Sequence, residues 1–103
     1  MSVKNFDNGD KFVDVAGVPF FVKEVESNTR TDSGMGRTDT KMGIITINRE
    51  MPVEIKQSVL IHEWLHSVLD WYGFEESNDE KLIATLQNEL FRAGFRVPAI
   101  VNE

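Results

Sequence analysis

The pattern of apolar and polar residues divides the chain into a strand-rich first half and a helical second half. Apolar residues alternate with polar ones, or run together, over residues 11–15 and 18–25, on either side of the pair Ala16-Gly17. Two such runs joined by a two-residue turn predict a β-hairpin. Residues 36–40 and 43–48 predict a second pair of strands, because the latter, GIITIN, is rich in β-branched residues.

A long helix is predicted over residues 52–73, PVEIKQSVLIHEWLHSVLDWYG. Its apolar residues fall on two nearly opposite sides, which indicates a helix packed between the sheet and another helix. Pro52 fits the first helical position, and Gly73 fits a left-handed cap at the end. We expect a polar strip between the two apolar sides to face a cleft or solvent. This strip consists of Lys56, Glu63, Ser67 and Asp70.

A second helix is predicted from about Asp79 to Ala93. Apolar residues recur there every three or four positions and would form the core face: Leu82, Ile83, Leu86, Leu90 and Ala93. The run from Ser77 to Glu80 has the form of a capping box, and Gly94 ends the helix. This order of elements predicts an α+β fold, in which an antiparallel sheet of about four strands packs against two antiparallel helices.

The size of the chain indicates one small domain. Its 103 residues, 41% of them hydrophobic, are enough for one core and too few for two. We interpret residues 1–103 as a single domain, with residues 1–10 as a loose N-terminal arm. The beginning has no apolar run typical of a signal peptide, and no segment approaches the roughly 18 apolar residues of a membrane span. We therefore expect a cytoplasmic protein.

Charge and cysteine content narrow the possible sites. The net charge is −6 and the eleven basic residues are scattered, which argues against a nucleic-acid groove, because phosphate contacts need clustered Lys and Arg. The chain has no cysteine. It therefore has neither disulfides nor thiolate metal ligands, and any bound metal must take nitrogen and oxygen ligands.

Both histidines of the chain stand in the motif HEWLH within the predicted long helix. His62 and His66 are four residues apart, so at about 3.6 residues per turn their rings leave one face and can bind one ion. Glu63 lies about 100° around the helix from His62, close enough to act on a metal-bound water without being a ligand. This pattern is typical of zinc hydrolases, in which the glutamate is the general base.

A two-histidine zinc site usually takes a third protein ligand, commonly a carboxylate. The candidates are the acidic residues after Gly73: Glu75, Glu76, Asp79 and Glu80. Glu80 is favoured, because a second helix that returns antiparallel brings its first turn near the end of the HEWLH helix. Asp79 is the second candidate, because it lies closer to the centre of the apolar stripe. Helix capping is the competing explanation for both residues.

The chain from Phe12 to about Phe91 resembles the small zinc metallopeptidase-like proteins of bacteriophages and prophages. The resemblance is strong over residues 61–86, IHEWLHSVLDWYGFEESNDEKLIATL, and weaker over VDVAGVPFFV and GIITIN. These proteins are minimal gluzincin-type zincins, distantly similar to the ImmA/IrrE and SprT-like peptidases. In them a helical HExxH ends in a Gly-aromatic pair and is followed by a helix of the form Glu-x-x-apolar. The resemblance implies that His62, His66 and Glu80 bind Zn²⁺ and that Glu63 is the general base. The chain departs from the pattern in lacking a downstream Tyr or His for the oxyanion, for which Tyr72 is a weak candidate.

Together these features predict a zinc-dependent peptidase that acts on an unidentified peptide or protein, without a nucleic-acid or membrane partner. An extended substrate would pair with an exposed strand edge, either 36–40 or 43–48. If a phage encodes the chain, it would act in the host cytoplasm. Two alternatives remain open. One is an inactive zincin-fold module that binds a phage or host protein, and the other is a metal-free structural protein with HEWLH in its core.

Overall fold

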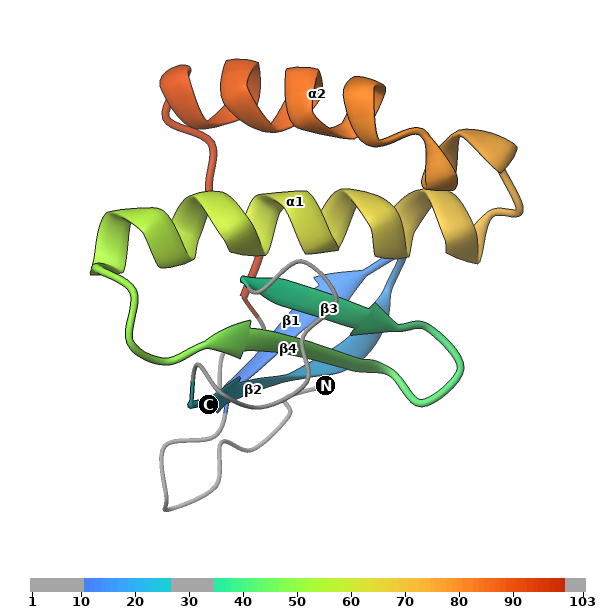
Figure 1. Cartoon of the computed structure of the whole chain (residues 1–103). Helices are drawn as coiled ribbons and strands as arrows, with labels where there is room; N and C mark the ends of the chain where they lie inside the picture. Colours follow the sequence, from blue (N-terminus) through green and yellow to red (C-terminus); the bar gives the residue numbers. More distant parts are fainter. Residues whose placement is uncertain (1–10, 27–34, 100–103) are drawn as a thin grey trace.

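A computed structural model describes residues 11–26 and 35–99 of the chain. These residues form four strands, then a long helix, a short 3₁₀ turn and a second helix (Figure 1). The elements are β1 (Lys11–Val15), β2 (Val18–Val25), β3 (Gly36–Asp39), β4 (Ile44–Asn48), α1 (Val53–Trp71), η1 (Glu75–Asn78) and α2 (Glu80–Arg92). The predicted α+β fold is confirmed. The expected N-terminal arm, residues 1–10, lies outside the described residues.

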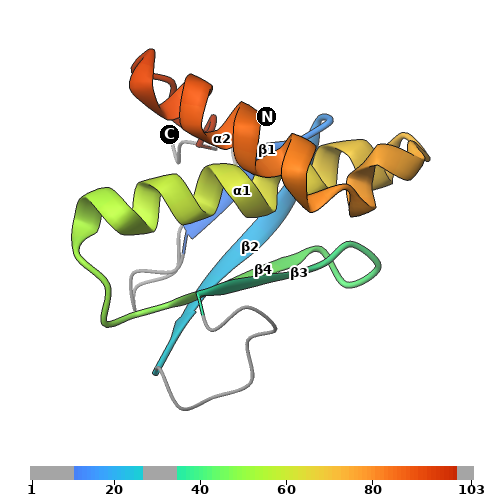
Figure 2. The same ribbon diagram turned by 45° about the horizontal axis from the view of Figure 1, so that its top comes forward.

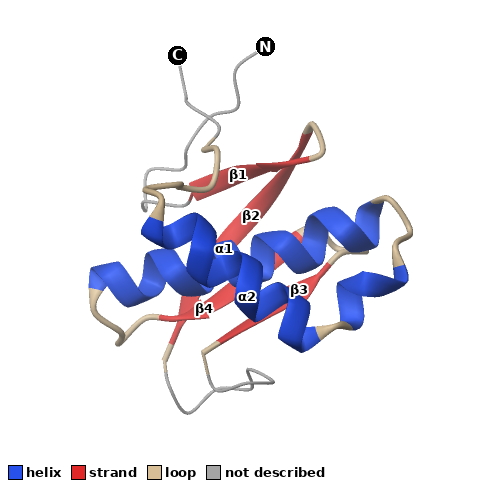
Figure 3. Ribbon diagram, turned by 90° about the horizontal axis from the view of Figure 1, so that it is seen from above, coloured by secondary structure: helices blue, strands red, loops and turns tan. Residues whose placement is uncertain are grey.

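The elements form three layers, with α1 in the middle. One side of α1 contacts the sheet and the other contacts α2 and η1, and Figure 2 shows α1 between them. Seen from above, both helices lie over the same face of the sheet (Figure 3). This is the sandwiched position that two apolar sides predict for a helix. In the part of the chain that the structure describes, no helix is both long and apolar enough to cross a membrane.

The sheet is mixed rather than purely antiparallel, with the strand order β1-β2-β4-β3. The hairpins β1-β2 and β3-β4 are antiparallel as expected, but β2 and β4 are parallel. The reason is that β3 takes the outer position and β4 inserts between β2 and β3, so β4 runs in the direction of β2. As a result β3 is an edge strand. The alternative expectation, that residues 43–48 form an exposed edge, is wrong because β4 is paired on both sides.

Residues with positive φ form the turn between β1 and β2 and end helix α1. Ala16 (φ 53°) and Gly17 (φ 84°) form the two-residue turn between β1 and β2, as a right-twisted hairpin requires. Gly73 (φ 80°) ends α1 as predicted, and the Phe74 N–H closes the cap by donating to the Leu69 carbonyl at 2.9 Å. Pro52 is the residue before the first helical position rather than in it.

The main core lies between α1 and the sheet. Phe20 and Ile45 of the sheet are fully buried there, and Val59 of α1, which lies next to Gly36 of β3, is buried as well. Between the two helices, Ile83 of α2 is also fully buried. The packing of Ile83 holds the first turns of α2 against the middle of α1, where the two histidines lie.

Candidate metal centre

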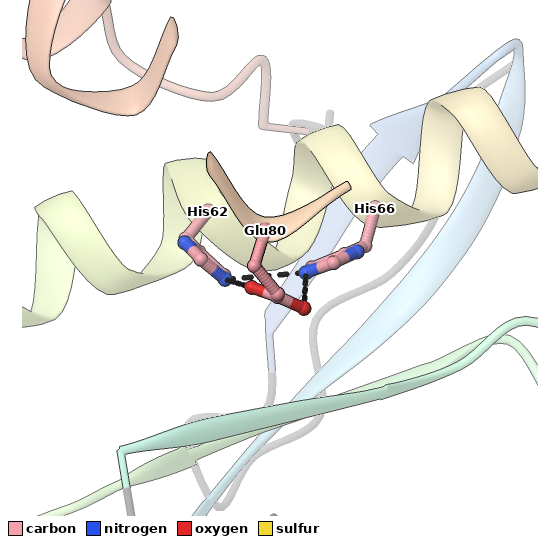
Figure 4. A group of neighbouring side chains, drawn as sticks. All are labelled: His62, His66 and Glu80. Atoms are coloured by element: carbon pink, nitrogen blue, oxygen red, sulfur yellow. Dashed lines mark hydrogen bonds and ion pairs between the residues drawn. The ribbon is translucent and has the colours of Figure 1, made fainter. Parts of the chain in front are cut away.

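His62, His66 and Glu80 meet at one point between α1 and the start of α2 (Figure 4). The Nε2 atoms of the histidines are 3.2 Å apart. The Glu80 carboxylate bridges them, with Oε1 at 3.1 Å from His62 Nε2 and Oε2 at 3.1 Å from His66 Nε2. The structure therefore brings together the three side chains that were expected to bind a metal.

Asp79, the second candidate for the third ligand, has a different position. Its Oδ1 accepts a hydrogen bond from the Leu82 N–H at 3.0 Å, so it is the N-cap of α2. The capping box that was expected to begin at Ser77 is therefore wrong. Ser77 lies two residues earlier, buried within η1. With the cap supplied by Asp79, the Glu80 side chain is available to the histidines.

The η1 turn also orients one of the histidines. The Nδ1 atom of His66 hydrogen-bonds the main-chain carbonyl of Ser77. Because a carbonyl can only accept, His66 Nδ1 carries hydrogen, and in the neutral ring the lone pair is on Nε2. This arrangement, in which a backbone carbonyl fixes the tautomer of a ring, is common for histidines that bind metals.

The donor set fits a zinc ion. His66 Nε2 faces a Glu80 carboxylate oxygen at 3.1 Å, and a cation between these two atoms, either a proton on the ring or a metal ion, stabilises the pair. In a tetrahedral site with bonds of about 2.0–2.1 Å, ligand atoms are about 3.3 Å apart, close to the observed 3.1 to 3.2 Å. The Glu80 side chain is 69% exposed, which leaves one side open for water or substrate.

Glu63 lies next to this group but is not part of it. The residue is only 5% exposed, and the Thr38 hydroxyl of β3 donates to its Oε1 at 2.8 Å. Burial raises the pKa of the Glu63 carboxyl, against the opposing effects of the Thr38 hydrogen bond and the two histidines. A carboxyl whose pKa is raised is a stronger base, as proton abstraction from water requires.

The polar strip of α1 was expected to face a cleft or solvent. In the structure only part of it lines a cleft, and the rest faces the sheet. Lys56 pairs with Glu24 of β2 at 2.7 Å. Ser67 is fully buried and donates to the Glu63 carbonyl at 2.8 Å. Glu63 and Asp70 do line a cleft. The strip can lie against the sheet because its polar side chains form hydrogen bonds or ion pairs with polar groups of the strands and of the helix itself.

The cleft has a volume of about 370 Å³ and lies between the edge strand β3 and helix α1. Its lining residues are Gly36, Arg37, Thr38, Thr40, His62, Glu63, His66, Asp70 and Glu80. Tyr72, the weak candidate for stabilising an oxyanion, is 64% exposed and does not line it. An edge strand, a general-base candidate and the histidine pair thus share one cavity.

Two residues of β3 contribute to the site without having been expected there. Thr38 holds the Glu63 carboxylate. Gly36 leaves room for it, since a Cβ at this position would lie 2.9 Å from Val59 Cγ1 and 3.0 Å from Glu63 Cγ. The sequence gives only a weak indication of this role: the glycine and the threonine are two residues apart in a strand and therefore lie on one face of it.

Comparison with known proteins does not assign the chain: no protein-family model, no curated protein and no solved structure matches it.

Proposed function

We propose that the protein is a zinc-dependent peptidase in which His62, His66 and Glu80 bind Zn²⁺ and Glu63 is the general base. The observation that supports it best is the convergence of these three ligands within 4.8 Å of one another, beside a buried carboxylate in the same cleft. In line with the resemblance of residues 61–86, we assign the protein to the minimal gluzincin-type zincins of phages and prophages, acting in the cytoplasm of the host.

In this mechanism a zinc ion held by His62, His66 and Glu80 would supply Lewis acidity. Glu63 would accept a proton from the attacking water and later deliver it to the leaving amine. The Thr38 hydroxyl keeps Glu63 Oε1 in place during both transfers. The sheet therefore contributes to catalysis through the position of one carboxylate.

The substrate in this proposal is an extended peptide segment. Strand β3 is the outermost strand on this side of the sheet, and its residues form one wall of the cleft. An extended peptide can add to such an edge through main-chain hydrogen bonds. This binding mode would place the scissile bond between β3 and the ligands on α1.

A zinc-binding module without turnover is the second candidate. Within the described residues, no tyrosine lines the cleft and its only histidines are the two candidate ligands. A peptidase of this type needs a donor for the oxyanion, and among the residues that the structure describes Arg37 is the only cationic side chain that lines the cleft. The module would keep zinc and bind a phage or host protein along β3.

The deciding experiment combines metal analysis with hydrolysis of a peptide library. The protein is purified without a histidine tag and without added zinc, beside the variant Glu63→Gln. A peptidase retains one equivalent of zinc in both forms and hydrolyses peptides only in the unsubstituted form. Zinc without hydrolysis in either form favours the binding module. Protein without metal, even after incubation with zinc, favours the structural alternative.

A further inference from the structure

Helix α2 contacts both ring nitrogens of His62. Glu80, its first residue, lies against Nε2. Gln87 lies seven residues later, two turns along the same face of the helix, and its Oε1 is 2.9 Å from His62 Nδ1. Ile83, fully buried between them, packs this face of α2 onto α1.

The neighbours of Gln87 determine which way its amide points. Its Nε2 lies 3.0 Å from the Ser58 carbonyl and 2.9 Å from the Ser58 hydroxyl. A carbonyl can only accept, so the NH₂ group must face Ser58 and the amide oxygen must face the ring. Since the amide oxygen also only accepts, His62 Nδ1 carries hydrogen, and in the neutral ring the lone pair is on Nε2.

We propose that Gln87 is a positioning residue that holds His62 in the Nδ1–H tautomer with Nε2 turned toward Glu80 and His66. The proposal rests on the metal site of the proposed function. For His66 the backbone carbonyl of Ser77 has the same effect, and no side-chain substitution removes it. For His62 the orienting group is the Gln87 side chain, so its contribution can be measured by mutation.

The choice of an amide rather than a carboxylate has a consequence for charge. Glu63, Asp70 and Glu80 already place three carboxylates at the cleft. A neutral orienting group fixes the ring without adding a further negative charge beside them. Removal of an orienting partner of this kind typically lowers metal affinity by about 10- to 100-fold.

The test uses Gln87→Met, which keeps most of the side-chain length and volume but has neither an amide oxygen nor an amide hydrogen. Ser58→Ala is the matched control, because it removes one contact of Gln87 and leaves the main-chain one. Nitrogen-15 NMR of the metal-free proteins reports which nitrogens of each ring carry hydrogen. Competition with a chromophoric chelator gives the zinc dissociation constant.

In the unsubstituted protein we expect hydrogen on the Nδ1 atoms of both histidines. In Gln87→Met, His62 should become a mixture of tautomers while His66 is unchanged, and the zinc dissociation constant should rise by about 10- to 100-fold. Ser58→Ala should raise the zinc dissociation constant less than Gln87→Met does. A purely structural role of Gln87 would leave both tautomers as they were.

Two results would overturn the proposal: an Nε2–H tautomer of His62 in the unsubstituted protein, or unchanged zinc affinity in Gln87→Met. The first measurement needs no variant, so it holds even if Gln87→Met fails to fold. Failure of the proposed function has a different signature, because the unsubstituted protein would then bind no zinc at all while His62 still showed the Nδ1–H tautomer.

Discussion

The hydroxyl of Thr38 on β3 donates a hydrogen bond to the carboxylate of Glu63 on α1 at 2.8 Å. This bond joins the edge strand, where we propose that substrate binds, to the general base of the proposed reaction. It also satisfies a carboxylate that the fold buries almost completely. Loss of the bond should therefore affect both catalysis and stability.

The variant Thr38→Val tests this link, since it keeps the shape of the side chain and removes the hydroxyl. We expect peptide hydrolysis to fall several-fold while zinc content is unchanged, because Glu63 loses its orientation but the three ligands remain. The buried carboxylate also loses a partner, which should lower the free energy of unfolding by about 1–3 kcal/mol. Thr38→Ser, which retains the hydroxyl, is the control for both measurements. Equal behaviour of the two variants would contradict the link.

Glu63→Gln should make the metal-free protein more stable at neutral pH. Burial raises the pKa of Glu63 in the folded state, so folding favours the protonated carboxyl. The stability from this protonation is fully present below the ordinary carboxyl pKa and is lost as the pH rises through the raised one. Each unit of raised pKa corresponds to about 1.4 kcal/mol. A glutamine side chain does not titrate and resembles the protonated carboxyl of glutamate, so its contribution to stability does not depend on pH.

The measurement is urea unfolding of both metal-free proteins between about pH 4 and pH 8, around the ordinary carboxyl pKa and above it. The stability of Glu63→Gln relative to the unsubstituted protein should increase with pH across this window. The comparison removes the contributions of titrating groups that do not interact with Glu63, because both proteins share them. A difference that stays constant with pH would show that burial does not penalise this carboxylate.

Gly36→Ala should disturb the same carboxylate from the other side. The new Cβ would lie 2.9 Å from Val59 Cγ1 and 3.0 Å from Glu63 Cγ, so β3 or α1 must shift. Such overpacking typically costs about 1–3 kcal/mol. Thermal unfolding measures the loss, and we expect the double variant Gly36→Ala/Val59→Ala to lose less than the sum of the two single changes, because the shorter side chain removes the closer contact. Strict additivity would contradict this packing.

The sequence predicts those parts of the fold and the site that depend on residues close together in the chain, and it predicts less well those that depend on contacts between separate elements. The spacing of His62 and His66 is local and follows from the helical repeat, so their convergence could be predicted. The position of Glu80 required only an antiparallel return of the next helix. The parallel pairing of β2 and β4 could not be predicted, because β4 inserts between β2 and β3, two consecutive strands that could instead have paired with each other.

The parts of the site that sequence patterns missed are contacts between elements. Thr38 and Gln87 are ordinary polar residues in a strand and a helix, and only the packing of β3 and α2 against α1 brings them to Glu63 and His62. The cap of α2 was misassigned for a related reason. Ser77 and Asp79 are both good caps, and the η1 turn determines that Asp79 takes this position.

This correction separates the roles of two adjacent carboxylates. Asp79→Ala should lower the free energy of unfolding of the metal-free protein by about 1 kcal/mol, with little effect on zinc affinity. Glu80→Ala should lower zinc affinity, because the Glu80 carboxylate contacts both histidines. It should have little effect on the stability of the metal-free protein, because Glu80 is exposed and does not cap the helix. Zinc titration and urea unfolding of both variants measure the two effects. A full equivalent of tightly bound zinc in Glu80→Ala would remove Glu80 from the ligand set.

Zinc should also stabilise the fold, because its proposed ligands come from two helices. His62 and His66 belong to α1 and Glu80 to α2, so an ion that binds all three links the two elements, and the unfolded chain has no such preformed site. At a free zinc concentration of 1,000 times the dissociation constant, the expected gain is about 4.1 kcal/mol. A chelator should therefore lower the melting temperature of the protein, and it should change that of Glu80→Ala much less. A melting temperature that is independent of both zinc and chelator would show that no ion links α1 and α2.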